Sequence, residues 1–478
     1  APANNKLIQF AQFLIGRHSR AVHTKNLGFP NFSRCHKENP MRMCKVGLCL
    51  ALGLLLPHAL KAATIDSLSD SFDAAAINAA NWTVSAADFE AGTGVFTADQ
   101  TTNPGQLTIA GTGSTNFWGG TTLQTVDSFD SSMSARIMVD RTSLSGSGSA
   151  YRSSLWIRQT DGDYLHFAQN VGENGWQFNN NNTGGGTDIG SLNPLDGSLG
   201  AHNMQLLYQP LGGNNARVSM FLDGVFAAST TYGSWENTTD FQARLSGMAR
   251  ASGDTVSAQF DNFRAQSFGT PTQTTASSTT GFAVSNSDLI EGIVPTVSGT
   301  ALGGQEGTST NAAVLSNGTF GQADLSNLGE VVSISNDTQL TYNLDLSSAP
   351  LGYDITGIDG FSGWRDAGRD NLDYAVLFET VDDPGIFQAL DVVSFAPAGG
   401  TPADGMVSIE DAMGGVLASG VSAIRFSFGT QENGYVGYRE FDVFGAATVV
   451  PEPASLAIWS LIGMGLTGFG YYRIRRKK

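Results

Sequence analysis

Short alternating runs of apolar and polar residues, separated by turn-forming residues, dominate the chain between residues 64 and 447. A period of two places every second side chain on one face of a strand, whereas a helix needs a period near 3.6. This region has no sustained helical period, and the chain's 58 glycines supply many turn positions. The pattern therefore predicts an all-β fold built from antiparallel strands.

Two hairpins are expected within this region. Arg217–Ala227 carries Asp223-Gly224 between two alternating runs, and an Asp-Gly pair adopts the positive φ angles of a type I′ turn. Leu155–Ala168 repeats the arrangement around Asp161-Gly162. Phe260–Arg264 has the pattern of a closing strand.

A polar segment divides the region in two. Residues 270–280 contain no large apolar side chain and cannot contribute to a core, which predicts a flexible Ser/Thr-rich linker. The linker separates residues 64–269 from residues 281–447, and each piece has the size of a β-sandwich. The expected fold class is all-β, with two antiparallel β-sandwich (jelly-roll) domains in tandem.

The charge of this region excludes one class of partner. Residues 64–451 hold twelve basic side chains, all arginine, and 41 acidic ones, a net charge of −29. Such a surface repels nucleic acid, so nucleic-acid binding is excluded. The three cysteines, Cys35, Cys44 and Cys49, all lie upstream of residues 64–451. This part of the chain, the body, therefore has no disulfide and no nucleophilic thiolate.

The N-terminal part has the layout of a secretory signal peptide. Met41–Lys45 is basic, Val46–Leu56 is apolar, and small residues at Ala62 and Ala63 offer a cleavage site. We therefore expect a signal peptide over residues 41–63. Residues 1–40 precede a good initiator and are expected to be a mis-assigned upstream segment.

The C-terminal part predicts a transmembrane helix. Leu456–Tyr472 carries no charge, and its seventeen residues would span about 25 Å as a helix, enough for a thin hydrocarbon core. The helix, expected over about residues 455–472, is followed by Arg473, Arg475, Arg476 and two lysines, which predict a cytoplasmic tail.

Together with Pro451, Glu452 and Pro453, this end resembles the PEP-CTERM sorting signal of exported bacterial proteins over residues 448–478. The resemblance implies passage through the secretion machinery and recognition by an exosortase-type membrane transpeptidase. It also implies an inner-membrane intermediate, followed by release to the cell surface, outer envelope or extracellular matrix. It gives no activity.

Residues 64–269 resemble concanavalin A-like, laminin-G-like domains, through the Asp70–Asp73 opening before Trp82, the Asp223-Gly224 hairpin and the Phe260–Arg264 strand. Members of this fold are often carbohydrate-binding, and some are glycoside hydrolases. Catalysis there needs paired carboxylates, and the Glu-x-Asp-x-x-Glu strand of the glucanase relatives is absent.

Several residues of this first domain are candidates for binding. Aromatic rings stack on sugars, so Trp118, Trp176 and Trp235, which lie among small and polar residues, are candidate platforms, with packing in the fold as the alternative. Trp82 and Trp156 follow strand patterns and are expected in the core. If the first and last strands pair, Asp70, Asp73 and Asp261 could hold Ca²⁺, the one cofactor that the sequence suggests, or remain ordinary surface acids.

Residues 281–447 resemble galactose-binding-like, discoidin-type sandwiches, through Leu340–Leu346, Tyr353–Asp359, Ser362–Asp366 and the closing Gly437–Gly445. Such modules bind sugars, lipid head groups or proteins through loops. The candidate site is a cluster that suits hydroxyl-rich ligands; its members are Trp364, Arg365, Asp366 and Arg369. The alternative is an Arg–Asp ion pair that fixes a loop over a core tryptophan.

The sequence thus predicts an exported, non-catalytic protein that binds carbohydrate or exopolysaccharide through its β-sandwiches. A purely structural spacer and a glycan-active hydrolase are the alternatives. His166 and His202, the two histidines of the body, lie in no motif of nucleophilic catalysis, so no enzyme is expected.

Overall fold

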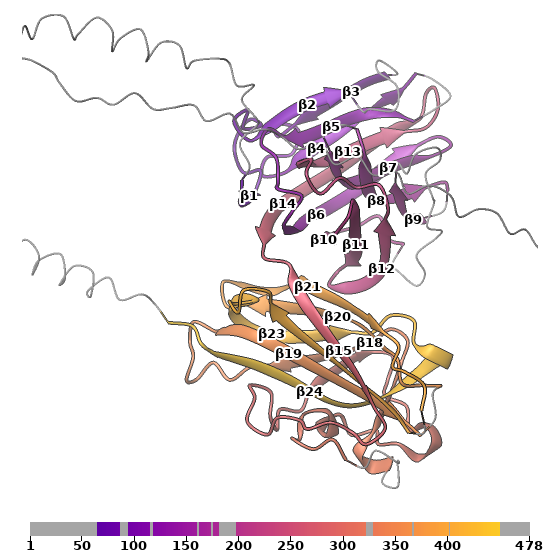
Figure 1. Cartoon of the computed structure of the whole chain (residues 1–478). Helices are drawn as coiled ribbons and strands as arrows, with labels where there is room; N and C mark the ends of the chain where they lie inside the picture. The colour runs from indigo at the N-terminus through magenta and orange to yellow at the C-terminus, as the bar shows by residue number, and fades with distance from the viewer. Residues whose placement is uncertain are drawn as a thin grey trace, which may run out of the picture. The chain divides into compact units, whose positions relative to one another are not determined.

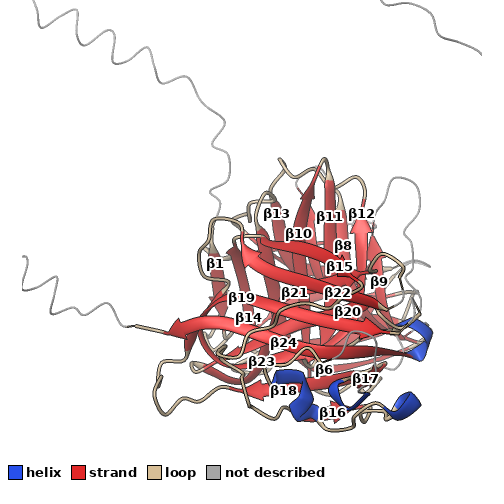
Figure 2. Ribbon diagram, turned by 60° about the horizontal axis from the view of Figure 1, so that its bottom comes forward, coloured by secondary structure: helices blue, strands red, loops and turns tan. Residues whose placement is uncertain are grey.

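The structure, a computed structural model, describes residues 65–86, 94–114, 118–159, 162–173, 175–180, 197–321, 328–365, 368–400 and 402–449. These residues belong to one compact unit. They form paired antiparallel strands and four short 3₁₀ turns, and no α-helix occurs among them (Figure 2). The all-β prediction is confirmed. The turns are η1 (Gln305–Gly307), η2 (Ala312–Ser316), η3 (Leu328–Glu330) and η4 (Glu432–Gly434).

Strands β1–β14 form two antiparallel sheets (Figure 1). The larger has the order β12-β11-β10-β6-β14-β4-β3, with β1 paired to β14, and the smaller has the order β2-β5-β13-β7-β8-β9. The bounds are β1 (Ser67–Asp70), β2 (Trp82–Ala86), β3 (Gly94–Asp99), β4 (Leu107–Gly113), β5 (Gly119–Thr125), β6 (Ser134–Ser147), β7 (Tyr151–Gln159), β8 (Tyr164–Val171), β9 (Gly175–Asn180), β10 (His202–Gly212), β11 (Asn215–Leu222), β12 (Val225–Tyr232), β13 (Phe241–Ala249) and β14 (Thr255–Phe268).

The two sheets share one hydrophobic core. Ile137 and Val139 of β6 enter it from the larger sheet, and Leu155 and Ile157 of β7 enter it from the smaller one. The alternation in the sequence is the cause, because alternate side chains of a strand face the same side.

Both predicted hairpins are present. β11 and β12 pair across Asp223 and Gly224, whose φ angles of 55° and 71° are both positive, as a type I′ turn requires. β7 and β8 also pair antiparallel. The expected closing strand Phe260–Arg264 lies within β14, where the register with β6 shifts between Asp261 and Arg264.

Strands β15–β24 form the second set, as two runs of five paired strands: β15-β22-β19-β24-β17 and β21-β20-β23-β18-β16. The runs join where Tyr353 and Ile355 of β19 pair with β23. A second core draws on both runs, with Ile358 and Phe441 from the first and Leu340 from the other. The bounds are β15 (Pro271–Ser278), β16 (Thr296–Gly299), β17 (Val332–Ser335), β18 (Thr338–Asn343), β19 (Tyr353–Trp364), β20 (Leu372–Thr380), β21 (Asp383–Phe395), β22 (Ala403–Asp411), β23 (Ala418–Ser427) and β24 (Tyr435–Ala447).

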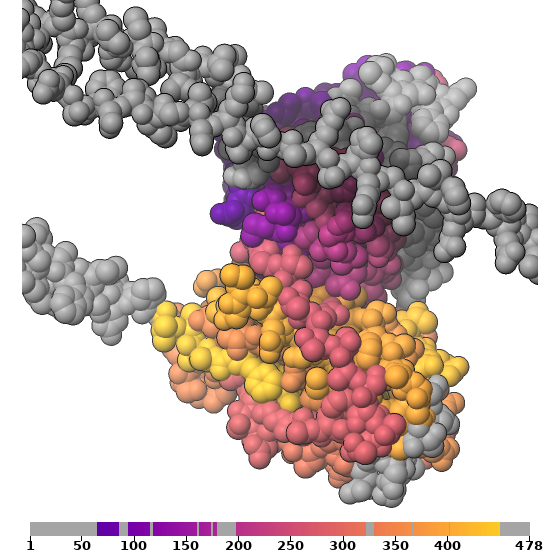
Figure 3. Space-filling view, in the orientation of Figure 1, coloured from indigo at the N-terminus to yellow at the C-terminus, as the bar shows by residue number. Residues whose placement is uncertain are grey.

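The segment predicted as a flexible linker is largely a strand. β15 pairs along its whole length with β22, from Pro271 opposite Asp411 to Ser278 opposite Asp404. An edge strand is held by backbone hydrogen bonds on one side, so it needs no large apolar side chain, and β-branched threonines suit it. Its first residue is Pro271, a position that proline tolerates. Its rose-coloured atoms lie at the surface in Figure 3.

Several predictions concern residues outside the described ranges. They are the upstream segment 1–40, the signal peptide 41–63 and the sorting motif of Pro451, Glu452, Pro453, Arg473, Arg475 and Arg476, together with the helix expected near residues 455–472. Within the ranges that the structure does describe, no helix has the length and apolar character needed to cross a membrane.

Candidate functional site

An apolar interface joins the two sets of strands. On β10, Leu206 and Tyr208 face the first core, so Leu207 between them faces the other way. Leu207 and Phe221 of β11 are fully buried against Leu377 of β20, together with Ala375, Ala389 and Val392. The outer face of β10 and β11 therefore packs against β20 and β21.

A buried carboxylate lies within this interface. Asp391 of β21 accepts hydrogen bonds at Oδ1 from Arg217 Nη2 (2.9 Å) and Gln209 Nε2 (2.8 Å), and at Oδ2 from Gln273 Nε2 (2.8 Å). The backbone N–H of Val392 donates to Oδ1 as well (2.8 Å). Burial raises the pKa of Asp391, and the charge of Arg217 opposes that rise. β10, β11 and β15 are thus tied to one acceptor on β21.

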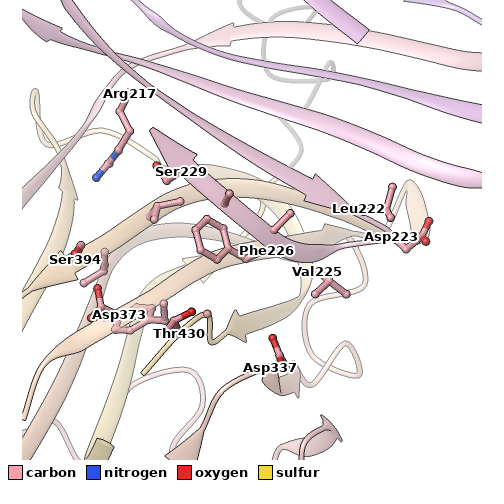
Figure 4. A pocket seen from close by; sticks show the side chains of 16 residues that line it. Arg217, Leu222, Asp223, Val225, Phe226, Ser229, Asp337, Asp373, Ser394 and Thr430 are labelled. Carbon is pink, nitrogen blue, oxygen red and sulfur yellow. The ribbon is translucent and has the colours of Figure 1, made fainter. Parts of the chain in front are cut away.

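A pocket of about 510 Å³ opens beside this interface, within the size range of small-molecule sites. Its apolar walls come from Leu222, from Val225–Ala228 and from Val392 and Val393 of β21. In Figure 4, Phe226 lies between Leu222 and Asp223 at one end and a polar group at the other end. That polar group comprises Asp373, Ser394 and Thr430; Arg217, Ser229 and Asp337 also line the pocket.

The pocket has an acidic balance. Asp223, Asp337 and Asp373 contribute three carboxyl groups, and the one guanidinium in its lining, Arg217, already pairs with Asp391. Burial raises the pKa of Asp373; a hydrogen bond with Ser394 opposes this rise, and nearby Glu432 adds to it. Such a lining offers acceptors and hydroxyl groups to a neutral hydroxyl-rich ligand, and it repels anions.

The tryptophans predicted as sugar platforms are buried instead. Trp118, Trp176, Trp235 and Trp364 expose 6%, 2%, 0% and 0% of their surfaces, so none has a free ring face for stacking. Arg152 lies over Trp118 at 4.2 Å, and Trp176 and Trp235 belong to the first core. Packing in the fold, the alternative stated for these rings, is therefore what the structure shows.

The cluster around Trp364 is held by ion pairs. Arg365 Nη2 lies 2.6 Å from Glu306 Oε2, and Arg369 Nη1 lies 3.3 Å from Glu306 Oε1. Arg369 also lies over the ring of Tyr435 at 4.6 Å. The alternative of an ion pair over a buried tryptophan is thus observed, with Glu306 as the acid, while Asp366 lies outside the described residues.

The calcium prediction for Asp70, Asp73 and Asp261 stays a prediction. β1 and β14 do pair, as that prediction requires, and in the described residues no three His, Cys, Asp or Glu side chains lie close enough together to hold an ion. Both oxygens of Asp70 are already hydrogen-bonded: Oδ1 accepts from Phe72 N (2.8 Å) and Oδ2 accepts from Trp82 Nε1 (2.7 Å).

A serine, a histidine and an aspartate line up at the start of β10. Ser198 Oγ lies 2.9 Å from His202 Nε2, and His202 Nδ1 lies 2.7 Å from Asp223 Oδ2. A proton on Nδ1 would bond to Asp223 and leave Nε2 to accept from Ser198 Oγ. The carbonyl oxygen of Ser198 is 3.2 Å from the same Nε2, and Asp223 Oδ1 accepts from Asn203 N. No sequence motif predicts this arrangement.

The pocket residues were also missed. The Asp-Gly pair predicts only a turn, yet Asp223 also borders the pocket and contacts His202. Phe226 follows the same turn by two residues, and an aromatic residue beside an Asp-Gly turn is the one sequence signal that points here. Asp373 and Ser394 belong to a distant part of the chain, so only folding brings them to Phe226.

Comparisons with known proteins leave the family open. No protein-family model matches the sequence, and no curated protein matches it. The β-glucanase of Bacillus licheniformis is 14% identical with a TM-score of 0.32, over 43% of this chain and 99% of that one. A prokaryotic lichenase from a mouse hindgut metagenome is 16% identical with a TM-score of 0.31, over 42% and 99%. The potassium-bound carbohydrate recognition domain of Emp46p is 13% identical with a TM-score of 0.28, over 39% and 88%. Likenesses this weak carry no conclusion about this chain.

Proposed function

We propose that this protein is an exported surface or extracellular-matrix protein that binds a neutral polyhydroxylated ligand, such as extracellular polysaccharide, without chemistry of its own. The observation that carries the proposal is the pocket beside β12, where the ring of Phe226 lines the same cavity as several carboxyl and hydroxyl groups. Sugar hydroxyls donate to carboxylates, and the C–H faces of sugars pack on aromatic rings.

The acidic lining narrows the ligand class. Three carboxyl groups and one paired guanidinium disfavour sulfated or uronate-rich glycans, and the body's charge of −29 acts in the same direction. Neutral hexose polymers are therefore the ligands expected in this pocket.

A glycan array with the full chain in detergent tests the binding function. We expect neutral glycans to bind and anionic ones not to bind, and we expect Asp373→Asn to weaken binding at least tenfold. Asp382→Asn, an exposed acid on the β20–β21 turn outside the pocket, is the matched control and should bind normally. Equal binding by both variants would remove the pocket from the proposal, and no binding to any glycan would favour the spacer alternative.

The localisation of the protein is a separate proposal, which rests on the two ends of the sequence. Export through the secretion machinery, an inner-membrane intermediate and an exosortase-type partner are all implied by the sorting signal that residues 448–478 resemble. Replacing Pro451, Glu452 and Pro453 with alanine should leave the protein in the inner membrane. Normal release of this variant would contradict the proposal.

A second candidate function is the hydrolysis of acyl esters on a glycan. It is favoured by the hydrogen-bonded row of Ser198, His202 and Asp223. In that reaction Ser198 Oγ attacks the ester carbonyl carbon, its proton passes to His202 Nε2, and the departing alcohol takes that proton. Water then hydrolyses the acyl-serine and restores Ser198. Labelling by a fluorophosphonate probe that is lost in Ser198→Ala would support this reaction. The absence of labelling in the parent protein would leave the non-catalytic function.

A further inference from the structure

Two fully buried carboxyl groups lie side by side on β24. Glu440 and Asp442 are two residues apart and face away from the core that Phe441 and Val443 enter. One oxygen of each is hydrogen-bonded: Glu440 Oε1 accepts from Gly318 N (3.1 Å), and Asp442 Oδ2 accepts from Ser285 N (2.8 Å). The other oxygen of each, Glu440 Oε2 and Asp442 Oδ1, is buried without a partner.

The segment Ser285–Glu291 brings two more carboxyl groups to this place. Asp288 Oδ1 accepts from Val443 N of β24 (3.2 Å), and its Oδ2 is buried without a partner. Glu291 Oε2 is also buried and unpartnered, and it lies 2.9 Å from the position that a Cβ would take on Gly318. Because Gly318 also donates to Glu440, Glu291 and Glu440 lie against the same residue.

No positive charge balances these four acids in the described part of the chain, where none of them forms an ion pair. The neighbouring Arg439 points elsewhere, toward Asp404 and the carbonyl oxygen of Phe320. Burial raises the pKa of Glu440 to about 9 and that of Asp442 to about 7, and the neighbouring acids add to both. Ionised together and unpaired, these carboxylates would strongly destabilise the fold.

We propose that a divalent cation, Ca²⁺, binds between β24 and the segment Ser285–Glu291, with Glu440, Asp442, Asp288 and Glu291 supplying its carboxylate ligands. The donor set consists of oxygen alone, without histidine or cysteine, which selects hard cations over zinc or copper. Ca²⁺ takes six to eight oxygen ligands in flexible geometry, so backbone carbonyls and water complete its shell.

The four carboxyl groups would have to move closer together to share one ion. In the described residues no three acidic side chains are yet close enough together to hold an ion. Carboxylates without a counter-charge repel one another, so the cation must draw Ser285–Glu291 toward β24. Binding should therefore order this segment as well as stabilise the second set of strands, independently of the pocket beside β12.

The test uses the full chain, stripped with a chelator and titrated with CaCl₂ at pH 7.5. We expect saturable binding in calorimetry, a rise in Tm and slower amide exchange over residues 285–291. Glu440→Gln and Asp442→Asn, which keep side-chain shape, should each weaken Ca²⁺ binding at least tenfold, and Asp382→Asn should bind as the parent does. Glu291→Gln, at a half-buried position, covers the case in which a β24 variant fails to fold.

Two results would overturn the cation site. One is a parent protein whose Tm and amide exchange do not respond to Ca²⁺, which would mean that protons alone neutralise the acids. The other is undiminished Ca²⁺ binding in Glu440→Gln, Asp442→Asn and Glu291→Gln alike.

Discussion

Asp391 offers a direct test of how the two sets of strands are held together. Replacing it with alanine leaves the guanidinium of Arg217, the amides of Gln209 and Gln273 and the N–H of Val392 without their shared acceptor. Removing one partner of a buried ion pair typically costs about 3–5 kcal/mol. We expect Asp391→Ala to lower the free energy of unfolding by that amount.

A double variant separates the cost of stranded donors from the value of the pair itself. In Asp391→Leu with Arg217→Met, apolar side chains of similar volume replace both ions, and such replacements are often neutral or stabilising. The double variant should therefore lose much less stability than Asp391→Ala. Compared with its own single variants, Asp391→Leu and Arg217→Met, it should show a coupling energy of about 2 kcal/mol or more.

Urea unfolding of the full chain measures these differences, with amide exchange at β10 and β21 as a local probe. A chain of this size can unfold in steps, so each transition is fitted separately. In Asp391→Ala the interface should open first. A loss below about 1 kcal/mol, or single-variant losses that simply add in the double variant, would refute this account of the interface.

Three further outcomes are expected. Burial raises the pKa of Asp404 from 3.8 to about 6, so the folded state binds this proton more tightly than the unfolded state does. The stability that the protonated carboxyl group contributes is therefore lost as the pH rises from about 4 to 6. Asp404→Asn should flatten that part of a profile of urea midpoint against pH, by about 3 kcal/mol at most. Gly437→Ala should lower the free energy of unfolding by about 1–3 kcal/mol in the same assay, because its Cβ would lie 2.5 Å from a ring carbon of Trp364 and 2.7 Å from the carbonyl oxygen of Gly363. Alternate amides of Pro271–Ser278 should exchange slowly because β15 pairs with β22, whereas uniformly fast exchange would restore the linker prediction.

The alternation of side chains was enough to predict the all-β class and the two hairpins. A period of two and an Asp-Gly turn are local signals, and Asp223 and Gly224 adopt the φ angles that those signals require. The linker prediction failed because it considered only burial. Backbone hydrogen bonds hold β15 at an edge, and composition does not report them.

The binding residues were largely beyond the reach of the sequence. Whether a tryptophan such as Trp235 stacks on a ligand or on Tyr208 depends on its neighbours in space, and here the ring is wholly buried. Asp373 and Phe226 are far apart in the chain and meet only across the interface between the two sets of strands. The sequence does not reveal acidic clusters either, because Glu440 and Glu291 are far apart in the chain and lie against the same residue, Gly318, only in the fold.

The placement of β24 determines how this chain would respond to tension. β24 ends at Ala447 and is paired with β17 on one side and β19 on the other, antiparallel to both. A load applied through the residues beyond Ala447 pulls along the strand axis, so the hydrogen bonds to both neighbours resist together in shear rather than opening one by one. A tether at this end would thus be held by a strand with a hydrogen-bonded neighbour on either side.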